Sequence, residues 1–344
     1  MKKHWFKITL LSLVAILTVV VWGLLDTLWN NMEEYEANSE IGAVTEYFQH
    51  LANDDYESIL QTSGFVFNEK NSREDYIQYL KDIFGSDFSD LRFAGRDGDV
   101  AGEKVYRIYS GNTPLGSVRL IPTEGQKRNW NAVAEVKYAD PMTVTAPSFV
   151  QVSANGKILT PDIGLTAPHE DFVKLDQKIQ VPTKETYTLK EYLYAPQLSA
   201  VAPDGTECVK TVAEDGMVSF TVPVAEKDKA TFEGLMTDFS KLYANYITKD
   251  ATFKMLKPKM LQGTEFYESV RTFYNGWYID HTRYEFRDME ISNIIRPDEN
   301  TFVGDIKFDY LIFRGTKEYK YPSAYRLSFC YSDGQWLLAD LKIK

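Results

Sequence analysis

The sequence predicts an α+β protein with one N-terminal transmembrane helix, and three observations support this fold class. An uncharged apolar run opens the 344-residue chain, two later regions each place helical patterns before strand patterns, and a β-rich region lies between them. The predicted segments are a cytoplasmic tail at 1–7, a transmembrane signal-anchor at 8–25, a stalk at 26–39, and three folded domains at 40–139, 140–226 and 227–344.

The composition is that of a folded, acidic protein. Apolar residues make up 44% and charged residues 25% of the chain, which excludes disordered and collagen-like proteins. Three of the 38 basic residues precede the apolar run and all 49 acidic residues follow it, so the rest of the chain has 35 basic against 49 acidic residues. Because nucleic-acid backbones require clustered Lys and Arg, we expect no nucleic-acid partner.

The apolar run from Ile8 to Leu25 is eighteen residues long, close to the roughly 20 that a helix needs to cross a bilayer. Lys2, Lys3 and Lys7 precede it, and acidic residues follow it. The positive-inside rule therefore places the N-terminus in the cytoplasm and the bulk of the chain outside the cell. A cleaved signal peptide is the alternative, but no small-residue cleavage site is evident after the run.

The region 40–139 begins with helical patterns and continues with strand patterns. Apolar positions at helical spacing predict helices over 41–51 and 73–84, the second with Ser72 as its N-cap and Gly85 as its stop. Aromatic and β-branched runs then predict strands at 91–94, 105–109, 115–121 and 130–138.

The region 227–344 repeats this order. It has a helical stripe over 232–246, a short helix after Ala251, and a helix capped by Thr264 whose stripe reaches Trp277. Four alternating strands follow between Arg283 and the C-terminus, with Asp333-Gly334 as a hairpin turn. Three segments match between the two regions in the same order, 48–60 with 243–256, 72–85 with 264–276 and 129–139 with 335–343, so we hypothesise a shared ancestry.

The region 140–226 has short β-rich runs separated by Asn155-Gly156, Asp204-Gly205 and Asp215-Gly216, dipeptides that favour tight hairpins. A small β-sandwich is the expected closure, and 186–194 is either one helical turn or another strand. Residues available for its inner faces include Val152, Ile158, Ile179, Val181, Val209 and Phe220. A disulfide between Cys208 and Cys330 remains open, and two cysteines are too few for a disulfide framework or a zinc cluster.

The order of helix, turn, helix, capped helix and a four-stranded sheet ending on a Trp-containing strand resembles the NTF2-like cone fold. The resemblance is carried by FQHLANDDYESIL (48–60), by YANYITKDATFKML (243–256) and by the closing strands. TVTAPSFVQVSANGKIL (143–159) resembles the start of β-domains in anchored Gram-positive envelope proteins, including those associated with teicoplanin resistance. The resemblance implies two NTF2-like cones that flank an all-β sandwich.

Patterns for catalysis and metal binding are sparse. The sequence contains no GxSxG, SxxK with KTG, or HExxH motif. Asp280-His281 is the best candidate for an acid–base dyad, although adjacent residues on a strand point to opposite faces. We expect no metal ion and no cofactor, and we assign no catalytic residue.

Aromatic residues give the remaining signal for a binding site. Tyr and Trp suit amphipathic binding faces, and several lie in the last region. The candidate ligand-binding residues, which would stack on a cell-wall glycan or a peptide, are Tyr274, Trp277, Tyr278, His281 and Tyr310.

The sequence therefore favours a non-catalytic binding or scaffolding protein of the cell envelope, anchored through residues 8–25. One alternative is an enzyme or small-molecule carrier that uses the pocket of the C-terminal cone. A homodimer that pairs through the sheets of the cones is a further interpretation.

Overall fold

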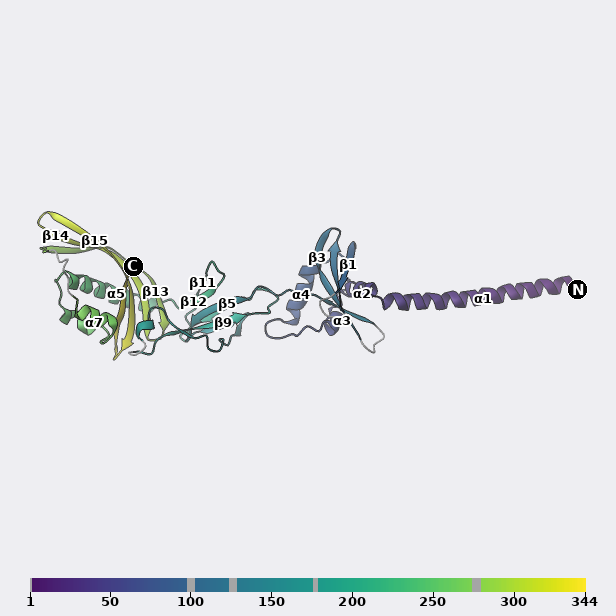
Figure 1. The fold of residues 1–344 in the computed structure, drawn as a ribbon, viewed down its shortest axis with the longest axis horizontal. Helices are drawn as coiled ribbons and strands as arrows, with labels where there is room; N and C mark the ends of the chain where they lie inside the picture. The colour runs from purple at the N-terminus through teal and green to yellow at the C-terminus, as the bar shows by residue number, and fades with distance from the viewer. Residues whose placement is uncertain (1, 98–102, 124–128, 176–178, 274–279) are drawn as a thin grey trace. The chain divides into compact units, whose positions relative to one another are not determined.

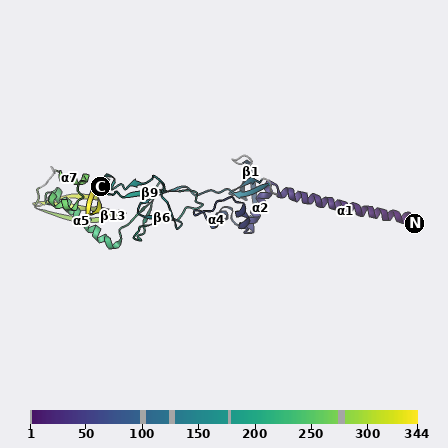
Figure 2. The same ribbon diagram turned by 90° about the horizontal axis from the view of Figure 1, so that it is seen from below.

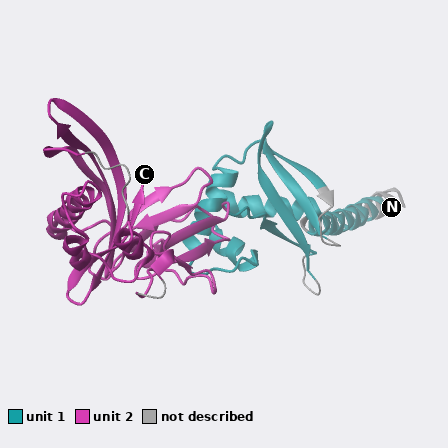
Figure 3. Ribbon diagram, turned by 60° about the vertical axis from the view of Figure 1, so that its left-hand side comes forward, with its two compact units in different colours: residues 1–138 teal, residues 139–344 magenta. Residues whose placement is uncertain are grey.

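The computed structural model describes residues 2–97, 103–123, 129–175, 179–273 and 280–344. The chain is α+β and divides into two compact units, Met1–Tyr138 and Ala139–Lys344 (Figure 3). Each unit contains a four-stranded antiparallel sheet that follows helices in the sequence, and the second unit also contains two further sheets, of three and five strands.

The first helix, α1 (Lys2–Ala37), is continuous in Figures 1 and 2. Its segment Leu10–Glu36 includes an eighteen-residue window with a mean hydropathy of 2.2, none of which is buried. This helix is long and apolar enough to cross a membrane. It also runs through most of the predicted stalk, which is therefore helical as far as Ala37.

In the first unit, three helices lie between α1 and one sheet. The helices are α2 (Glu40–Ala52), α3 (Tyr56–Thr62) and α4 (Arg73–Phe84). The sheet has the strand order β1 (Leu91–Asp97), β2 (Lys104–Ser110), β3 (Thr113–Pro122), β4 (Trp130–Ala134).

Local sequence sets the ends of α4 as predicted. Ser72 and Asp75 exchange hydrogen bonds with each other's backbone N–H in a capping box, and Gly85 ends the helix at a φ of 72°. Phe84 of α4 then packs edge-on against Phe48 of α2, with ring centres 5.2 Å apart, so the two helices share one core.

Two small sheets at the start of the second unit share one buried cluster. One has the order β10 (Leu198–Val201), β6 (Gln151–Ala154), β7 (Lys157–Ile158). The other has the order β11 (Val209–Val212), β12 (Val218–Thr221), β5 (Met142–Pro147), β9 (Thr183–Leu189), β8 (Ala167–Pro168). Neighbouring strands are antiparallel except β12 and β5, which are parallel.

Several sequence-based interpretations change in this region. Of the segment 186–194, Thr186–Leu189 belongs to strand β9, and residues 190–194 are neither strand nor helix. Ile158 and Val209 are exposed, because β7 and β11 are edge strands whose side chains are not covered. Ile179 and Val181 pack in a different cluster, described below, and not between the two small sheets.

The last 119 residues, from Glu226, form the four-stranded sheet of the second unit and its helices. The helices α5 (Glu226–Ile247), α6 (Phe253–Leu256) and α7 (Glu265–Arg271) lie on one side of the sheet (Figure 1), with a 3₁₀ turn at Lys257–Lys259. The strand order is β13 (Arg283–Asp298), β14 (Thr301–Arg314), β15 (Lys317–Ser332), β16 (Gln335–Ile343). This is the same succession of neighbours as in the first sheet, as the hypothesis of shared ancestry requires.

Two details of this last region bear on the sequence-based expectations. Asp333 and Gly334 form the predicted hairpin turn, with φ angles of 51° and 82°. Thr264 caps α7 as predicted, but α7 ends at Arg271, before the predicted stripe ends at Trp277. The remainder of that stripe from Tyr274 lies outside the described residues.

The face of the last sheet opposite its helices is covered by the segment between β8 and β9. Phe172 and Leu175 of this segment pack on Val303, Cys330 and Ala339 of the sheet, and Ile179 and Val181 lie against the same cluster. Cys330 is a free thiol in this cluster, and Cys208 is a free thiol against the core of the small sheets. The small sheets and the last sheet therefore belong to one compact unit.

Candidate functional site

Two of the five predicted ligand-binding residues, His281 and Tyr310, lie among the described residues and belong to one polar cluster. Tyr274, Trp277 and Tyr278 lie outside the described residues. The cluster, which we call the Asp250 cluster, consists of Asn245, Thr248, Asp250, His281, Tyr284 and Tyr310.

Asp250 is the centre of the cluster because the end of α5 brings it there. The helix ends at Ile247, Lys249 adopts a φ of 67°, and the backbone N–H of Asp250 then donates to the carbonyl of Asn245 at 2.8 Å. The Oδ2 atom of Asp250 lies 3.0 Å from His281 Nε2 and accepts from the Thr248 hydroxyl at 2.6 Å.

Tyr310 reaches the same carboxylate from strand β14. Its hydroxyl lies 2.9 Å from the Thr248 hydroxyl and 3.4 Å from Asp250 Oδ2, and it donates to Asn245 Oδ1 at 3.2 Å or to Asp250. Burial, together with the negative charge of Asp250, raises the pKa of Tyr310 well above its usual value. The phenol is therefore neutral at physiological pH and acts as a donor within the cluster.

His281 pairs with Asp250 from the end of α5, whereas the Asp280–His281 dyad stays a prediction. Asp280 is exposed, whereas the His281 side chain is 2% exposed and within hydrogen-bond distance of Asp250. A carboxylate that holds an imidazole in this way fixes its orientation. Because the ring is almost completely covered, a substrate reaches it only if neighbouring groups move.

The interior between the helices and the last sheet is filled in the described part of the chain. Phe302 stacks on Phe232 and on Phe329, with ring centres 4.1 Å and 4.6 Å apart and planes within 7° of parallel. Met236 and Phe239 of α5 pack against the same cluster and are at most 2% exposed. These side chains fill the space between α5 and the sheet, so they leave no room there for a ligand.

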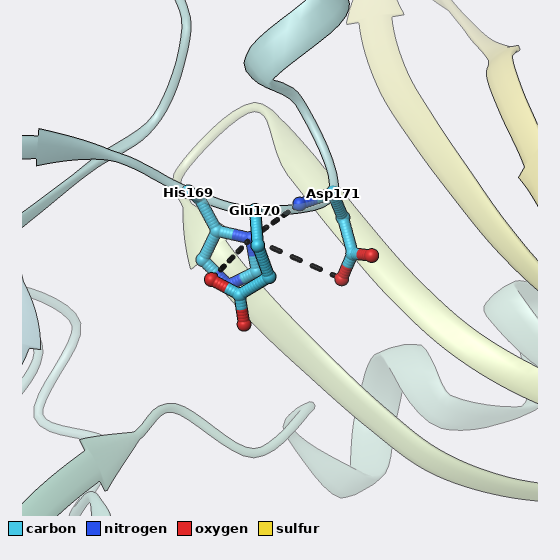
Figure 4. Close-up of side chains that lie close together, drawn as sticks. All are labelled: His169, Glu170 and Asp171. Carbon is cyan, nitrogen blue, oxygen red and sulfur yellow. Dashed lines mark hydrogen bonds and ion pairs between the residues drawn. The ribbon is translucent and has the colours of Figure 1, made fainter.

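A second polar group, His169, Glu170 and Asp171, lies in the segment between β8 and β9 (Figure 4). The His169 Nδ1 atom is 3.8 Å from Glu170 Oε2 and 3.9 Å from Asp171 Oδ2. One ligand atom from each residue lies within 4.8 Å of the others, so the spacing alone would allow a metal ion.

The charges around this group do not fit a metal site. Glu170 pairs with Lys184, and Asp171 accepts from Arg326 Nε at 2.9 Å and from Lys342 at 3.0 Å. These bonds lower the pKa of Asp171 although its burial acts in the opposite direction. A cation would have to displace three positively charged side chains, so we interpret the group as a structural link between segments of the second unit.

Burial governs the protonation of His169 in this link. The side chain is 4% exposed, and desolvation lowers its pKa to about 4, although the carboxylates nearby act in the opposite direction. The imidazole is therefore neutral at pH 7, and its Nδ1 atom faces the backbone N–H of Asp171 at 3.4 Å. A neutral ring at this position adds no charge to the balanced set of carboxylates and basic side chains.

Sequence reasoning missed Asp250, Asn245, Thr248 and Tyr284. Thr248-Lys249-Asp250 appeared in the sequence as a turn after a helix, which is correct as far as the backbone is concerned. One signal in the sequence could have found Asp250. It follows a predicted helix that packs on a sheet rich in aromatic residues. Its partner, His281, is 31 residues away, and no spacing rule connects them.

Comparisons with known proteins establish no family for this chain. No protein-family model matches it, and no curated protein matches it. A solved structure described as an "Ntf2 like protein involved in plasmid conjugation" aligns with 74% of this chain and 76% of its own chain. The aligned residues are 9% identical and the TM-score is 0.24, which does not establish a shared fold.

Proposed function

We propose that this chain is a non-catalytic binding or scaffolding protein of the cell envelope. In this proposal, α1 holds it in the membrane, the N-terminus is cytoplasmic and residues 40–344 lie outside the cell. Two NTF2-like cones at 40–139 and 227–344 flank the sandwich at 140–226. The three lysines that precede the apolar run and the acidic residues that follow it support this orientation.

The observation that supports a non-catalytic role is the packed interior of the last region. The stack of Phe232, Phe302 and Phe329 lies between α5 and the sheet, where a binding cone would be hollow. Because the interior is filled, a binding partner would have to be recognised by residues on the outer surface of the domain. Tyr321 and Tyr331 are 40% and 47% exposed on strand β15, so they offer aromatic faces to an envelope protein, a cell-wall glycan or a peptide.

A second candidate function is favoured by the Asp250 cluster. A His–Asp pair with a covered imidazole beside a neutral Tyr is a combination that enzymes use for proton transfer. If the covering groups move, His281 would act as a base and Tyr310 as a donor toward a bound small molecule. This would make the C-terminal region an enzyme or a small-molecule carrier.

Substitution of the pair separates these two functions. In cells that lack the chain, we expect full-length His281→Asn and Asp250→Asn variants to restore the wild-type phenotype within about twofold. The reason is that a binding surface on β15 does not use these side chains. A variant without residues 8–25 should fail, because the protein would no longer be held at the membrane.

If the C-terminal region is an enzyme, both variants should fail to restore the wild-type phenotype. Loss of a general acid or base costs about 10²- to 10⁴-fold in rate. Failure of both variants to restore function, while their thermal unfolding remains like that of the wild type, would favour catalysis and contradict our proposal. Thermal unfolding is needed as a control because the cluster also joins α5 to the sheet.

A further inference from the structure

The first compact unit contains a cavity that none of the proposals above uses. It has a volume of about 240 Å³ and lies among α2, α3 and the start of β4. Polar and aromatic side chains line it, including Glu46, His50, Gln61, Thr62, Trp130 and Asn131. Drug-sized ligands occupy pockets of about 300 Å³ or more, so this cavity suits a smaller ligand such as a single ring.

The bonds of His50 determine what it offers to a ligand. Its Nδ1 atom lies 2.7 Å from Asp55 Oδ2. An ionised carboxylate only accepts hydrogen bonds, so a neutral His50 carries its proton on Nδ1 and presents Nε2 as an acceptor. Asp55 is fixed in turn because it caps α3 and accepts from the backbone N–H of Ser58 at 3.3 Å. The imidazole in the wall of the cavity is thereby oriented.

The charge of the lining selects against anions. Glu46 lies 3.7 Å from His50 Nε2, and its carboxylate adds negative charge at the wall. Among the described residues that line the cavity there is no Lys or Arg, and the amide of Gln61 provides a donor and an acceptor. A ligand that carries several hydroxyl groups and no negative charge satisfies these groups best.

Trp130 adds an extended aromatic face to this polar lining. It is the first residue of β4 and is half-buried, so its ring is held by the sheet and part of it remains accessible. An aromatic face next to amide and carboxylate groups complements a ring that is apolar on its faces and hydroxylated at its edge. A pyranose sugar has this chemistry.

We propose that the cavity between α2, α3 and β4 binds a neutral sugar ring, which stacks on Trp130 and bonds to His50 and Gln61. The inference concerns residues 43–132 alone and is independent of the function proposed for the last sheet. A failure of one therefore leaves the other unaffected.

The test is ligand titration of the full chain in lipid nanodiscs, which avoid detergents with sugar head groups. The probes are methyl β-glucoside, glucosamine and glucose 6-phosphate, which are neutral, cationic and anionic rings of similar size. Saturation-transfer NMR should show saturable binding of the neutral sugar with a Kd on the order of 1 mM, as expected for so small a ligand. The phosphate should bind at least about tenfold more weakly.

Variants assign the binding to this cavity. Trp130→Ala should weaken binding of the glucoside by about tenfold or more, and Gln61→Ala by about threefold. Gln61 is exposed on α3, so its variant is expected to fold even if Trp130→Ala does not. The matched control is Trp29→Ala on α1, an exposed Trp that does not line the cavity, which should leave the affinity unchanged.

Three results would overturn the proposal. These are the absence of saturable glucoside binding, binding that is unchanged in the folded Gln61→Ala variant, and binding of glucosamine but not of the neutral sugar. The last result would assign the cavity to a cationic ligand attracted by Glu46.

Discussion

His169 and His281 show how the surroundings of a side chain decide its role. Both imidazoles are nearly covered, with 4% and 2% of their side chains exposed, and both lie near carboxylates. The carboxylates near His169 are already paired with Lys184, Arg326 and Lys342, so they do little to stabilise a charged imidazole. Burial therefore dominates the pKa of His169 and lowers it. The His281 imidazole instead lies within hydrogen-bond distance of the Asp250 carboxylate.

The lowered pKa of His169 predicts a loss of stability in mild acid. The unfolded chain takes up a proton near pH 6.5, but the folded state does so only near pH 4, so stability rises with pH between these values. From pH 6.5 to pH 5 the second unit should lose about 2 kcal/mol through this residue. Urea unfolding of the full chain at both pH values measures the loss.

The variant His169→Gln provides the control for this prediction. It removes the titrating group, so the difference between the two pH values should shrink by about 2 kcal/mol. Glu170 and Asp171, whose pKa values are lowered, lose their contributions only in more acidic solution and remain in the variant. An unchanged pH dependence in the variant would show that the buried imidazole does not govern stability here.

At the scale of elements, glycine sets how closely helices approach their sheets. A Cβ atom built on Gly116 of β3 would lie 2.5 Å from Ile83 Cγ2 and 3.2 Å from the ring of Phe84, both on α4. On β14, a Cβ at Gly304 would lie 2.8 Å from the sulfur of Met236 on α5. Each helix therefore contacts its sheet at a strand position occupied by glycine, where no side chain separates the two.

We expect Gly116→Ala to destabilise the first unit by about 1–3 kcal/mol, because the added methyl group forces α4 away from β3. The matched control is Gly234→Ala, an exposed position within α5 where an added Cβ meets no atom within 4 Å. That substitution should stabilise α5 by about 0.5–1 kcal/mol. Chemical denaturation of the two variants gives both values, and a neutral Gly116→Ala would contradict the packing described here.

The secondary structure was largely predictable because its signals are local. The Ser72 cap, the Gly85 stop and the Asp333-Gly334 turn depend on neighbouring residues, and the structure confirms them. The alternation of Phe302, Ile306 and Phe308 likewise identified the face of β14 that packs against the helices. The end of α7 at Arg271 was not predictable, because an apolar stripe continues past the last helical residue.

The candidate site was predictable only in part. His281 and Tyr310 stood out by residue type, but their connection depends on Asp250, which tertiary packing brings from the far end of α5. The pairing of Asp171 with Arg326 spans 155 residues, so no sequence pattern indicated it. Contacts of this kind depend on the three-dimensional arrangement and leave no periodic signal.

At the scale of the molecule, a charged network unites the segments of the second unit. Arg326 bonds to Asp171 at 2.9 Å and to Asp305 at 3.0 Å, and it joins the segment before η1 (Val173–Leu175) to strands β14 and β15. Asp305 also accepts from Lys344 and from Asn293. Arg296 of β13 pairs with Asp204 of the small sheets at 2.6 Å. The small sheets are thereby fixed to the last sheet.

We expect Arg326→Met to destabilise the second unit by about 3 kcal/mol, because it removes a partner from two buried carboxylates. Lys307→Met is the matched control, since Lys307 and Glu290 are both largely exposed and their pair contributes at most about 1 kcal/mol. Urea denaturation of the second unit within the full chain measures both. Equal losses in the two variants would show that the network does not hold the unit together.

The orientation of the chain across the membrane tests the central proposal most directly. Cysteine can be introduced at Lys3 or at Lys317, which lies at the exposed start of β15, in chains whose two native cysteines are replaced by alanine. We predict that a membrane-impermeant maleimide labels position 317 in intact cells and labels position 3 only after the cells are permeabilised. Labelling of position 3 but not of position 317 in intact cells would place the bulk of the protein in the cytoplasm and contradict a role at the cell envelope.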